Sequence, residues 1–447
     1  MTPMHLFDEA CSTTDLLELM PPLALQGDVV RYRYGGQDRL LLNDPEDTYR
    51  VVADPRKQFA ALPLLQRVMG EGLLVAHDLE RWKPRRLVVQ REMSPGKVAK
   101  HAGLVMENTR RVVDSWSPGQ RISLRDEVNR LALDNLGDTV FGEEFAGHRE
   151  IVRETLELLL EAFDALESGQ RNELLEQRLE ESITKLEAAL AGIVDGRRAS
   201  AGDPVYVLDV LIRAAKSGDP VFADPFIRDE SITMMIAGYD TTAFIIGAAT
   251  VLLARHPEAR QRLRAEVEAA RTAEVAPEKF VKAVPFARLV IAETLRLYPP
   301  IPFMHRPLLE DQVIAGQTLP EGTLVTASAW VAHHSPKLFK DPLVFDPDRF
   351  SPERRTEIPR HAYFPFGMGQ RTCVGNHFAM LSMAIAVALI AADTDLRFDS
   401  TDLAIEAPIT LRFADEALAT VTDVRGRDDR PGRDSAEAGC TRGDEVR

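Results

Sequence analysis

Residues 364–375 read Phe-Pro-Phe-Gly-Met-Gly-Gln-Arg-Thr-Cys-Val-Gly, and no other stretch of the chain is as informative. Cys373 lies there in a loop with three glycines, just before an apolar run over 378–391 that is typical of a helix. Glycine lets a backbone approach a neighbouring group closely, and backbone N–H groups at the start of a helix stabilise a thiolate. A lone cysteine is more often inert core filler, but this setting favours a thiolate that binds a metal.

The stretch resembles the heme-binding loop of the cytochromes P450, which reads Phe-Gly-x-Gly-x-Arg-x-Cys-x-Gly. The matching positions are Phe366, Gly367, Gly369, Arg371, Cys373 and Gly375. The resemblance implies that Cys373 is the axial ligand of the heme iron and that Phe366, Gly367, Arg371 and Gly375 contact heme b. A dinucleotide-binding loop is the obvious rival, and it fails because Thr372 stands where the third glycine belongs and no clear βαβ unit surrounds it.

Composition limits the classes of protein to which the chain can belong. It has 447 residues, of which 45% are hydrophobic and 28% charged, as in ordinary globular proteins. A formal charge of −15 argues against a nucleic-acid partner. The three cysteines, Cys11, Cys373 and Cys440, are too widely spaced for a disulfide framework and favour a reducing compartment. The longest apolar run, over 243–254, is shorter than the ~20 residues that span a bilayer, so we expect a cytoplasmic protein without a signal peptide or membrane anchor.

Periodicity predicts a mainly α protein with a small β-rich region. Segments 29–34 and 39–42 flank a glycine turn and predict a β-hairpin. Helical spacing dominates 81–198, and a long helix is expected over 230–255, stopped by Pro257. Further helices are expected over 257–271 and 286–297, and short strands over 311–325. We expect one catalytic domain over 1–423 and a disordered, highly charged tail over 424–447.

The long helix contains Ala-Gly-Tyr-Asp-Thr-Thr at 237–242, between strongly apolar flanks. Polar side chains inside a buried helix are costly without partners, and a simple interpretation is a kink in which threonine bonds back to a carbonyl. The segment also resembles the oxygen-activation motif of the cytochromes P450, and both interpretations can hold. The resemblance implies that Thr241 holds dioxygen or its water, that Asp240 relays protons, and that Ala237 and Gly238 leave space over the heme.

Three further residues resemble a structural network of the same family. Glu293 and Arg296 stand three residues apart on one helix face, and alone they predict only a weak surface pair. Arg349 lies in a Pro-x-Arg-Phe element between that helix and the cysteine loop. This order implies a Glu-Arg-Arg cluster that supports the chain below the heme. No carboxylate or cysteine cluster lies near His333 and His334 in the sequence. The family has a His-x-x-Pro-like structural element here, so the resemblance implies that both histidines are structural.

Cationic residues predict where the acidic edge of a heme would lie. Trp82 and Arg86 are four residues apart, as in the Trp-x-x-x-Arg helix of the cytochromes P450. By resemblance we assign Arg86, Arg371 and Arg306 to the heme propionates, since arginine suits carboxylates, with Trp82 as a fourth donor. The nearby Lys83, Arg85, Arg91, Lys97 and Lys100 predict a solvated basic face, on which an acidic ferredoxin could dock.

The implied activity is monooxygenation of a hydrophobic small molecule, as in secondary metabolism. Dioxygen is the oxidant, a separate ferredoxin and reductase supply the electrons, and no fused redox module is visible in the sequence. Hydroxylation and epoxidation both remain open. The alternatives are a peroxide-dependent heme-thiolate enzyme and a non-catalytic heme sensor, and the pair Asp240 and Thr241 argues against both. The substrate pocket is expected along 62–76, 158–179, 234–241, 301–304 and Ile409.

Overall fold

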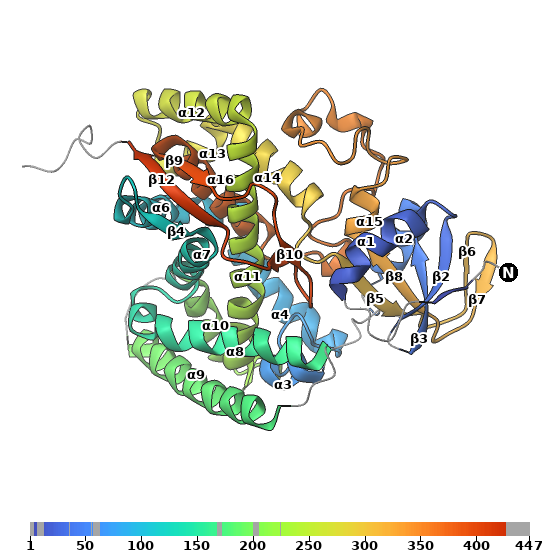
Figure 1. Ribbon diagram of the computed structural model, residues 1–447. Coiled ribbons are helices and arrows are strands. Elements are labelled where there is room, and N and C mark those ends of the chain that lie inside the picture. Colours follow the sequence, from blue (N-terminus) through green and yellow to red (C-terminus); the bar gives the residue numbers. More distant parts are fainter. Residues whose placement is uncertain are drawn as a thin grey trace, which may run out of the picture.

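The long helix expected over 230–255 runs through the middle of the molecule as α11 (Phe226–Arg255) (Figure 1). It ends where predicted, because the residue before Pro257 is driven out of the helical region and His256 has φ −122° and ψ 77°. The computed structural model describes residues 4–6, 13–34, 36–54, 56, 63–167, 172–199, 205–223 and 225–425. Cys11, Cys440 and the tail over 426–447 lie outside them.

Helices surround α11 and form most of the structure. It packs against α7 (Leu124–Val140), α14 (Pro285–Leu297) and α16 (Asn376–Asp393). The outer helices are α3 (Pro63–Met69), α4 (Leu79–Glu92), α6 (Ala102–Ser115), α8 (Arg149–Glu167), α9 (Glu173–Ala199), α10 (Val207–Ala215) and α12 (Pro257–Thr272). Shorter helices are α1 (Thr13–Ala24), α2 (Pro45–Val52), α5 (Pro95–Val98), α13 (Phe280–Ala283) and α15 (Ala329–His333). The mainly α architecture is therefore confirmed.

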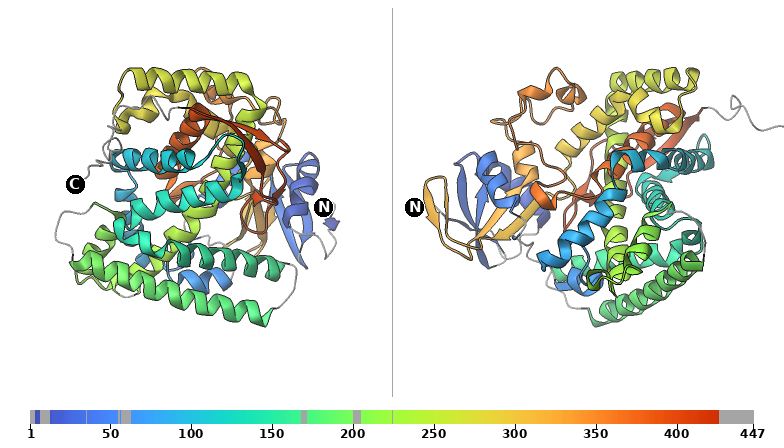
Figure 2. Two further views of the ribbon diagram at one scale, coloured as in Figure 1. Left: turned by 60° about the vertical axis from the view of Figure 1, so that its left-hand side comes forward. Right: turned by 180° about the vertical axis from the view of Figure 1, so that it is seen from behind.

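The β-rich region lies to one side of the helices (Figure 2). Its five-stranded sheet has the order β1 (Met4–Leu6), β2 (Val29–Tyr34), β3 (Gln37–Leu42), β8 (Leu324–Ser328) and β5 (Phe303–Pro307). Strands β2 and β3 form the predicted antiparallel hairpin, with Val29 opposite Leu42. The short strands expected over 311–325 are β6 (Gln312–Ile314), β7 (Gln317–Leu319) and the start of β8, so this prediction is also confirmed.

Two smaller sheets lie against the helices. One has the order β4 (Arg121–Ser123), β12 (Leu418–Val424) and β9 (Thr394–Phe398). Because β12 includes Val424, and Arg425 pairs with Asp395, ordered structure continues slightly past the predicted boundary at 423. The other sheet is the hairpin of β10 (Ile405–Glu406) and β11 (Arg412–Phe413). This hairpin lies across the middle of α11 (Figure 1).

Two helices, α11 and α16, are long and apolar enough to cross a membrane by length and composition alone. Counting only the apolar run over 243–254 therefore underestimated the apolar length of α11. Inside the protein, 72% and 67% of their most apolar windows are buried, as expected of core helices.

A buried polar cluster joins the first turns of α11 to the loop before α4. Asp229 accepts a hydrogen bond from the Glu71 backbone N–H at 2.8 Å, and Glu230 accepts one from the Leu73 N–H at 3.2 Å. Gly72 permits this approach, because a Cβ there would lie 1.9 Å from Thr233 Oγ1. Burial raises the pKa of Glu230 to about 8, with Asp229 adding to the shift and the Leu73 N–H and Arg85 opposing it.

Arg85 belongs to this cluster and corrects a prediction. Its side chain was expected on a solvated basic face, but it is 1% exposed and donates to the Glu71 and Val221 carbonyls. Arg85 lies three residues from Trp82 on α4, so it follows Trp82 into the interior, while Lys83 between them remains exposed.

The Glu293 cluster is fully enclosed between α14 and the segment that leads to the cysteine loop. Arg296 donates to both oxygens of Glu293 at 2.7 and 2.8 Å, and Arg349 Nε lies 3.4 Å from Glu293. Arg296 also donates to the His333 carbonyl at 2.8 Å. His333 Nε2 in turn accepts from the Phe364 N–H at 3.1 Å, so the cluster reaches the start of the cysteine loop.

The histidine pair is structural, as predicted. Burial lowers the pKa of His333 well below its usual range, so the ring stays neutral and accepts from Phe364. His334 Nδ1 lies 2.8 Å from the Trp330 carbonyl. Among the described residues, no group of three or more His, Cys, Asp or Glu side chains could hold a metal ion.

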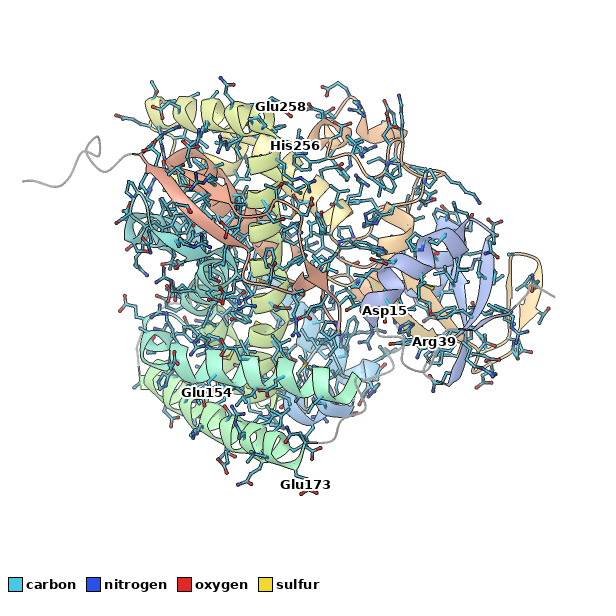
Figure 3. The ribbon with its side chains drawn as sticks, viewed as in Figure 1. Asp15, Arg39, Glu154, Glu173, His256 and Glu258 are labelled. Carbon is cyan, nitrogen blue, oxygen red and sulfur yellow. The ribbon has the colours of Figure 1, made fainter. Side chains whose placement is uncertain are left out.

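Replacing Glu230 by glutamine should change how stability depends on pH. A carboxyl whose pKa is raised by folding stabilises the fold at low pH, and this contribution is lost as the pH rises through the folded pKa. Relative to Glu230→Gln, the wild type should lose ~1 kcal/mol of unfolding free energy per pH unit between about 4.5 and about 8. Urea unfolding measures this difference. Glu154→Gln, on the outer surface of α8 (Figure 3), should follow the wild type at every pH. A difference between wild type and Glu230→Gln that does not vary with pH would contradict the assignment.

Replacing Glu293 by glutamine should destabilise the protein by about 3–5 kcal/mol, because two buried guanidinium groups lose their counter-charge. Urea unfolding at neutral pH checks this. Glu150→Gln is a matched control, since Glu150 and Arg153 are also three residues apart but exposed. That variant should unfold at the same urea concentration as the wild type. Equal effects of the two substitutions would show that burial of the Glu293 cluster is not what matters.

Candidate active site

The cysteine loop is held in one conformation by backbone hydrogen bonds and glycine. The Cys373 N–H donates to the Phe366 carbonyl at 2.9 Å, and the Gly367 N–H donates to the Phe364 carbonyl at 3.0 Å. Gly367 and Gly369 have φ values of +71° and +74°, which other residues rarely adopt. A Cβ on Gly369 would lie 2.4 Å from Ala53 Cα, whereas one on Gly367 would point into open space. The loop thus packs tightly against the end of α2 and leaves room beside Gly367.

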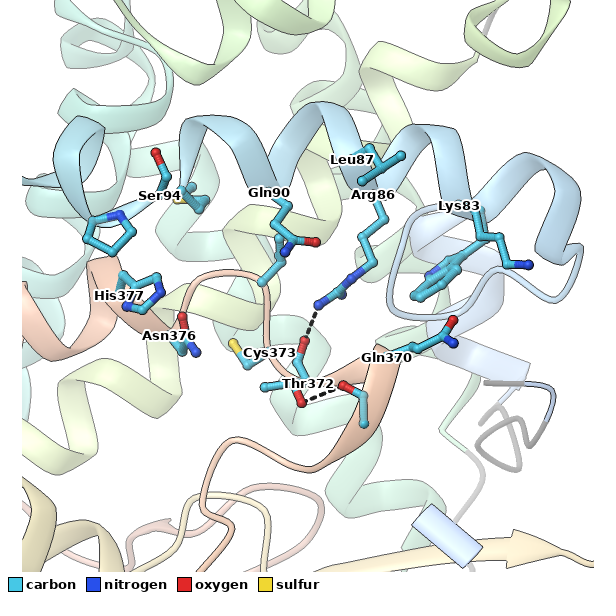
Figure 4. A pocket seen from close by; sticks show the side chains of 15 residues that line it. Lys83, Arg86, Leu87, Gln90, Ser94, Gln370, Thr372, Cys373, Asn376 and His377 are labelled. Carbon is cyan, nitrogen blue, oxygen red and sulfur yellow. Dashed lines mark hydrogen bonds between the residues drawn. The ribbon is translucent and has the colours of Figure 1, made fainter. Parts of the chain in front are cut away.

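Cys373 faces a cavity of about 590 Å³ between α4 and the start of α16 (Figure 4). Its side chain is exposed to this space, although the rest of its surroundings are protein. The enclosure raises the pKa of the Cys373 thiol, and the Gly375 N–H and the Arg86 charge oppose the rise. Both opposing groups favour the thiolate, so the local charges suit a cysteine that acts as a metal ligand.

Three arginines from separate elements lie near the cysteine loop. Arg86 of α4 donates to the Thr372 carbonyl, and Arg371 donates to the Ala76 carbonyl at 3.1 Å. Arg306 of β5 is 2% exposed, and burial, with a further contribution from Arg371, lowers its pKa to about 10. Burial also lowers the pKa of Arg371, as does the charge of Arg86. The three predicted propionate partners are therefore close enough to influence one another electrostatically.

Trp82 lies on α4 as predicted, but its indole N–H has a partner that the sequence did not indicate. Its indole N–H donates to the Leu73 carbonyl at 3.1 Å, so this donor already has a backbone partner. The guanidinium carbons of Arg371 and Arg86 lie 4.5 and 5.3 Å from its ring centroid. Trp82 is thus a platform that orients both arginines through cation–π contact rather than a fourth hydrogen-bond donor.

One turn of α11 is open although most of the helix is buried. Ala237 is exposed, and Gly238, Asp240 and Thr241 are only partly covered, whereas Met235 and Tyr239 are buried. Thr241 Oγ1 donates to the Ala237 carbonyl at 2.9 Å, the back-bond expected from the kink interpretation. The open turn leaves a space on this side of the helix.

Gly238 differs from its predicted role. A Cβ at this position would lie 3.0 Å from Leu136 Cδ2, so the missing side chain lets α7 pack closely against α11. Ala237 alone has the open exposure that was expected of both residues.

Asp240 has a partner that the sequence did not indicate. Its Oδ2 accepts a hydrogen bond of 2.5 Å from Thr410 Oγ1, in the turn between β10 and β11. Burial raises the pKa of Asp240, while Thr410 and then Arg412 oppose the rise. Thr410 stands 170 positions away in the sequence and matches no motif, so only the folded chain shows the pair.

Several observations fit a flat, acidic, apolar cofactor here. Cys373 is exposed and can bind iron, three arginines gather near its loop, and the space beside Gly367 is one that any side chain would fill. The cavity between α4 and α16 is a separate space, because no residue of α11 lines it. The exposed turn of α11 would be unusual in a core helix unless another group covered it. Arg86, Arg371 and Arg306 have the charge to bind the two carboxylates of heme.

Comparison with known proteins agrees with this site. A sequence profile of the cytochrome P450 family matches residues 24–400. The chain is 28% identical to a cyclooctat-9-en-7-ol 5-monooxygenase and 29% identical to a cyclooctatin synthase, both from Streptomyces melanosporofaciens, over 85% of each chain. It is 29% identical to cytochrome P450 4Z1 of Homo sapiens over 77% of this chain and 73% of that protein. The match covers most of the chain, so this protein belongs to the cytochrome P450 family, has its fold with heme b between α11 and the cysteine loop, and is a monooxygenase.

Proposed function

We propose that this enzyme hydroxylates or epoxidises a hydrophobic small molecule of secondary metabolism, with Cys373 as the axial ligand of the heme iron. The observation that carries the proposal is the exposed Cys373 just before the start of α16, where burial raises the pKa of its thiol while the Gly375 N–H and the Arg86 charge oppose the rise and favour the thiolate. Bound heme supplies the iron at which dioxygen is reduced and one oxygen atom passes to the substrate. Phe366, Gly367, Gly375 and Ala237 would line the heme.

The remaining steps fall to side chains near the open turn of α11. Thr241 would hold a proton or a water with its hydroxyl, which can leave the Ala237 carbonyl without breaking the helix. Asp240 would bring protons, since its carboxylate is shielded yet retains a hydrogen-bond partner. The apolar residues around them exclude water. This acid–alcohol pair disfavours a peroxide-dependent enzyme or a heme sensor, because neither needs protons delivered for dioxygen reduction.

The substrate class is inferred from the residues expected to line the pocket and from the two bacterial relatives. The described part of that expected lining is 63–76, 158–167, 172–179, 234–241, 301–304 and Ile409. Segments 63–76, 234–241, 301–304 and Ile409 are largely apolar, and Met234 can adapt its shape. Residue 62 and residues 168–171, also expected there, lie outside the described residues. The relatives are named for cyclooctat-9-en-7-ol and cyclooctatin. We therefore propose a terpenoid-like carbocyclic alcohol or alkene rather than a fatty acyl chain.

Electrons would come from a separate ferredoxin and its reductase in the cytoplasm. Lys83, Arg91 and Lys100 are exposed, and Lys83 lines the same cavity as Cys373, while Lys97 is paired with Glu92. This smaller basic face can still attract an acidic ferredoxin. The chain up to Arg425 would form one catalytic domain.

Spectral titration of the ferric protein tests the substrate class. A panel of carbocyclic terpenes, fatty acids, macrolides and aromatic peptides would be added while the Soret band is followed. A low-to-high-spin shift with the terpenes alone is the expected result, and a shift with fatty acids alone would overturn the proposed class. NADH-driven oxygen consumption that needs a ferredoxin and reductase would then separate a monooxygenase from a sensor.

Replacing Cys373 by alanine should abolish the reduced-CO absorption band of a thiolate-ligated heme, because no other cysteine among the described residues can take its place. The absorption spectrum of the reduced, CO-treated protein measures this. Cys440→Ala, in the tail, should keep the wild-type spectrum. An unchanged spectrum in Cys373→Ala would exclude Cys373 as the ligand.

Replacing Thr241 by alanine should divert electrons from product to peroxide, since the hydroxyl that manages the proton is lost. We expect roughly 10²-fold less product per NADH, at the low end for removal of an acid–base group. Thr250→Ala is a matched control in the same helix, because Thr250 also bonds back four residues, to the Ile246 carbonyl, but is buried. That variant should remain coupled. Tight coupling in Thr241→Ala would contradict the role.

A further inference from the structure

The turn 407–411 brings a hydroxyl directly onto the acid of α11. Thr410 Oγ1 and Asp240 Oδ2 are 2.5 Å apart, and the carboxylate has no proton to give when ionised, so the threonine donates. A short hydrogen bond to a charged oxygen is roughly twice as strong as a neutral one. Asp240 is near the middle of α11 (Phe226–Arg255), so the pair joins the β10–β11 turn to the centre of that helix.

Two backbone hydrogen bonds fix this turn independently of Asp240. The Ala407 N–H donates to Thr14 Oγ1 of α1 at 2.8 Å, and the Leu411 N–H donates to the Pro300 carbonyl at 2.8 Å. The turn is therefore attached on both sides of Thr410 to parts of the chain far away in sequence. The Thr410 hydroxyl is therefore held in place and can orient the Asp240 carboxylate.

The charged groups around Asp240 act in opposite directions. Arg412 of β11 pairs with Glu406 of β10 at 2.6 Å, at the two ends of the same turn. Thr410 and Arg412 favour the ionised carboxylate, whereas burial and Glu406 favour the protonated form. Tyr239, next to Asp240 on α11, has its pKa raised by burial and stays neutral. Within this set, Thr410 supplies the direct contact and the largest opposition to burial.

We propose that Thr410 is a positioning residue for proton handling: its hydroxyl holds the Asp240 carboxylate in one orientation and stabilises its ionised form, ready to accept a proton. This rests on the role proposed above for Asp240. The hairpin turn, which also carries Ile409 of the proposed substrate pocket, then sets both the position and the acidity of the proton-handling group. No motif of the sequence assigns such a role to residue 410.

Thr410→Val tests the proposal, because valine keeps the shape of threonine and removes the hydroxyl. We expect the pKa of Asp240 to rise by about one unit, as befits the loss of one hydrogen bond to a charged group. Thr410→Ser should restore the wild-type pKa. Glu406→Gln should shift the pKa in the opposite direction, downward, because it removes a negative charge and leaves that of Arg412.

The pKa can be measured in the heme-loaded ferric protein by infrared difference spectroscopy with ¹³C-labelled aspartate, with Asp240→Asn to assign the band. In turnover, the pH at which peroxide release rises should move with the pKa. An unshifted pKa in Thr410→Val, or no restoration by serine, would overturn the proposal. If Thr410→Val fails to fold, Thr410→Ala removes the same hydroxyl, and an unshifted pKa in that variant overturns the proposal equally.

The infrared titration needs no turnover, so the two proposals can fail separately. A protein that shows the expected pKa shifts but oxidises no substrate would contradict the proposed function and support the role of Thr410. Coupled turnover with the same Asp240 pKa in Thr410→Val, Thr410→Ser and Glu406→Gln would support the proposed function and contradict the role of Thr410.

Discussion

The proposed role of Cys373 requires a negative charge to be kept on its sulfur, and much of the surrounding structure bears on that requirement. Burial alone favours the neutral thiol. The Gly375 N–H and the Arg86 charge counter it, and both depend on the loop conformation that Gly367 and Gly369 make possible. The Glu293 cluster supports the loop from below through His333 and Phe364.

The long helix meets a second, related demand. It must be apolar enough to form the core and open enough at one turn to carry polar chemistry. Its first turns hold Asp229 and Glu230 against the loop before α4, and its middle exposes Ala237 and Thr241. Asp240, in the middle of the helix, accepts a hydrogen bond from Thr410, which lies far away in the sequence in the turn between β10 and β11. The helix therefore links the loop over 71–76, the open turn and the β10–β11 hairpin in a single rigid element.

The sequence was sufficient for what depends on local pattern. The C-terminal ends of α11 and α14 follow from the prolines just after them. The β2–β3 hairpin follows from the alternation of apolar and polar residues on either side of a turn. The cysteine loop and the open turn were found by motif. Contacts between residues far apart in the sequence could not be predicted. Neither Thr410 nor Arg85 carries a local signal of its partner. The close contact of Gly238 with α7 can be recognised only in the folded protein. Trp82 was placed correctly on α4, but its donor bonds the Leu73 carbonyl, a partner that exists only after folding.

The central claim is that Cys373 binds iron as a thiolate, and X-ray absorption at the iron edge of the purified ferric protein tests it most directly. The account predicts one sulfur neighbour in the first shell around iron, together with the four heme nitrogens, and its disappearance in Cys373→Ala. A first shell of nitrogen and oxygen alone in the wild-type protein would contradict it.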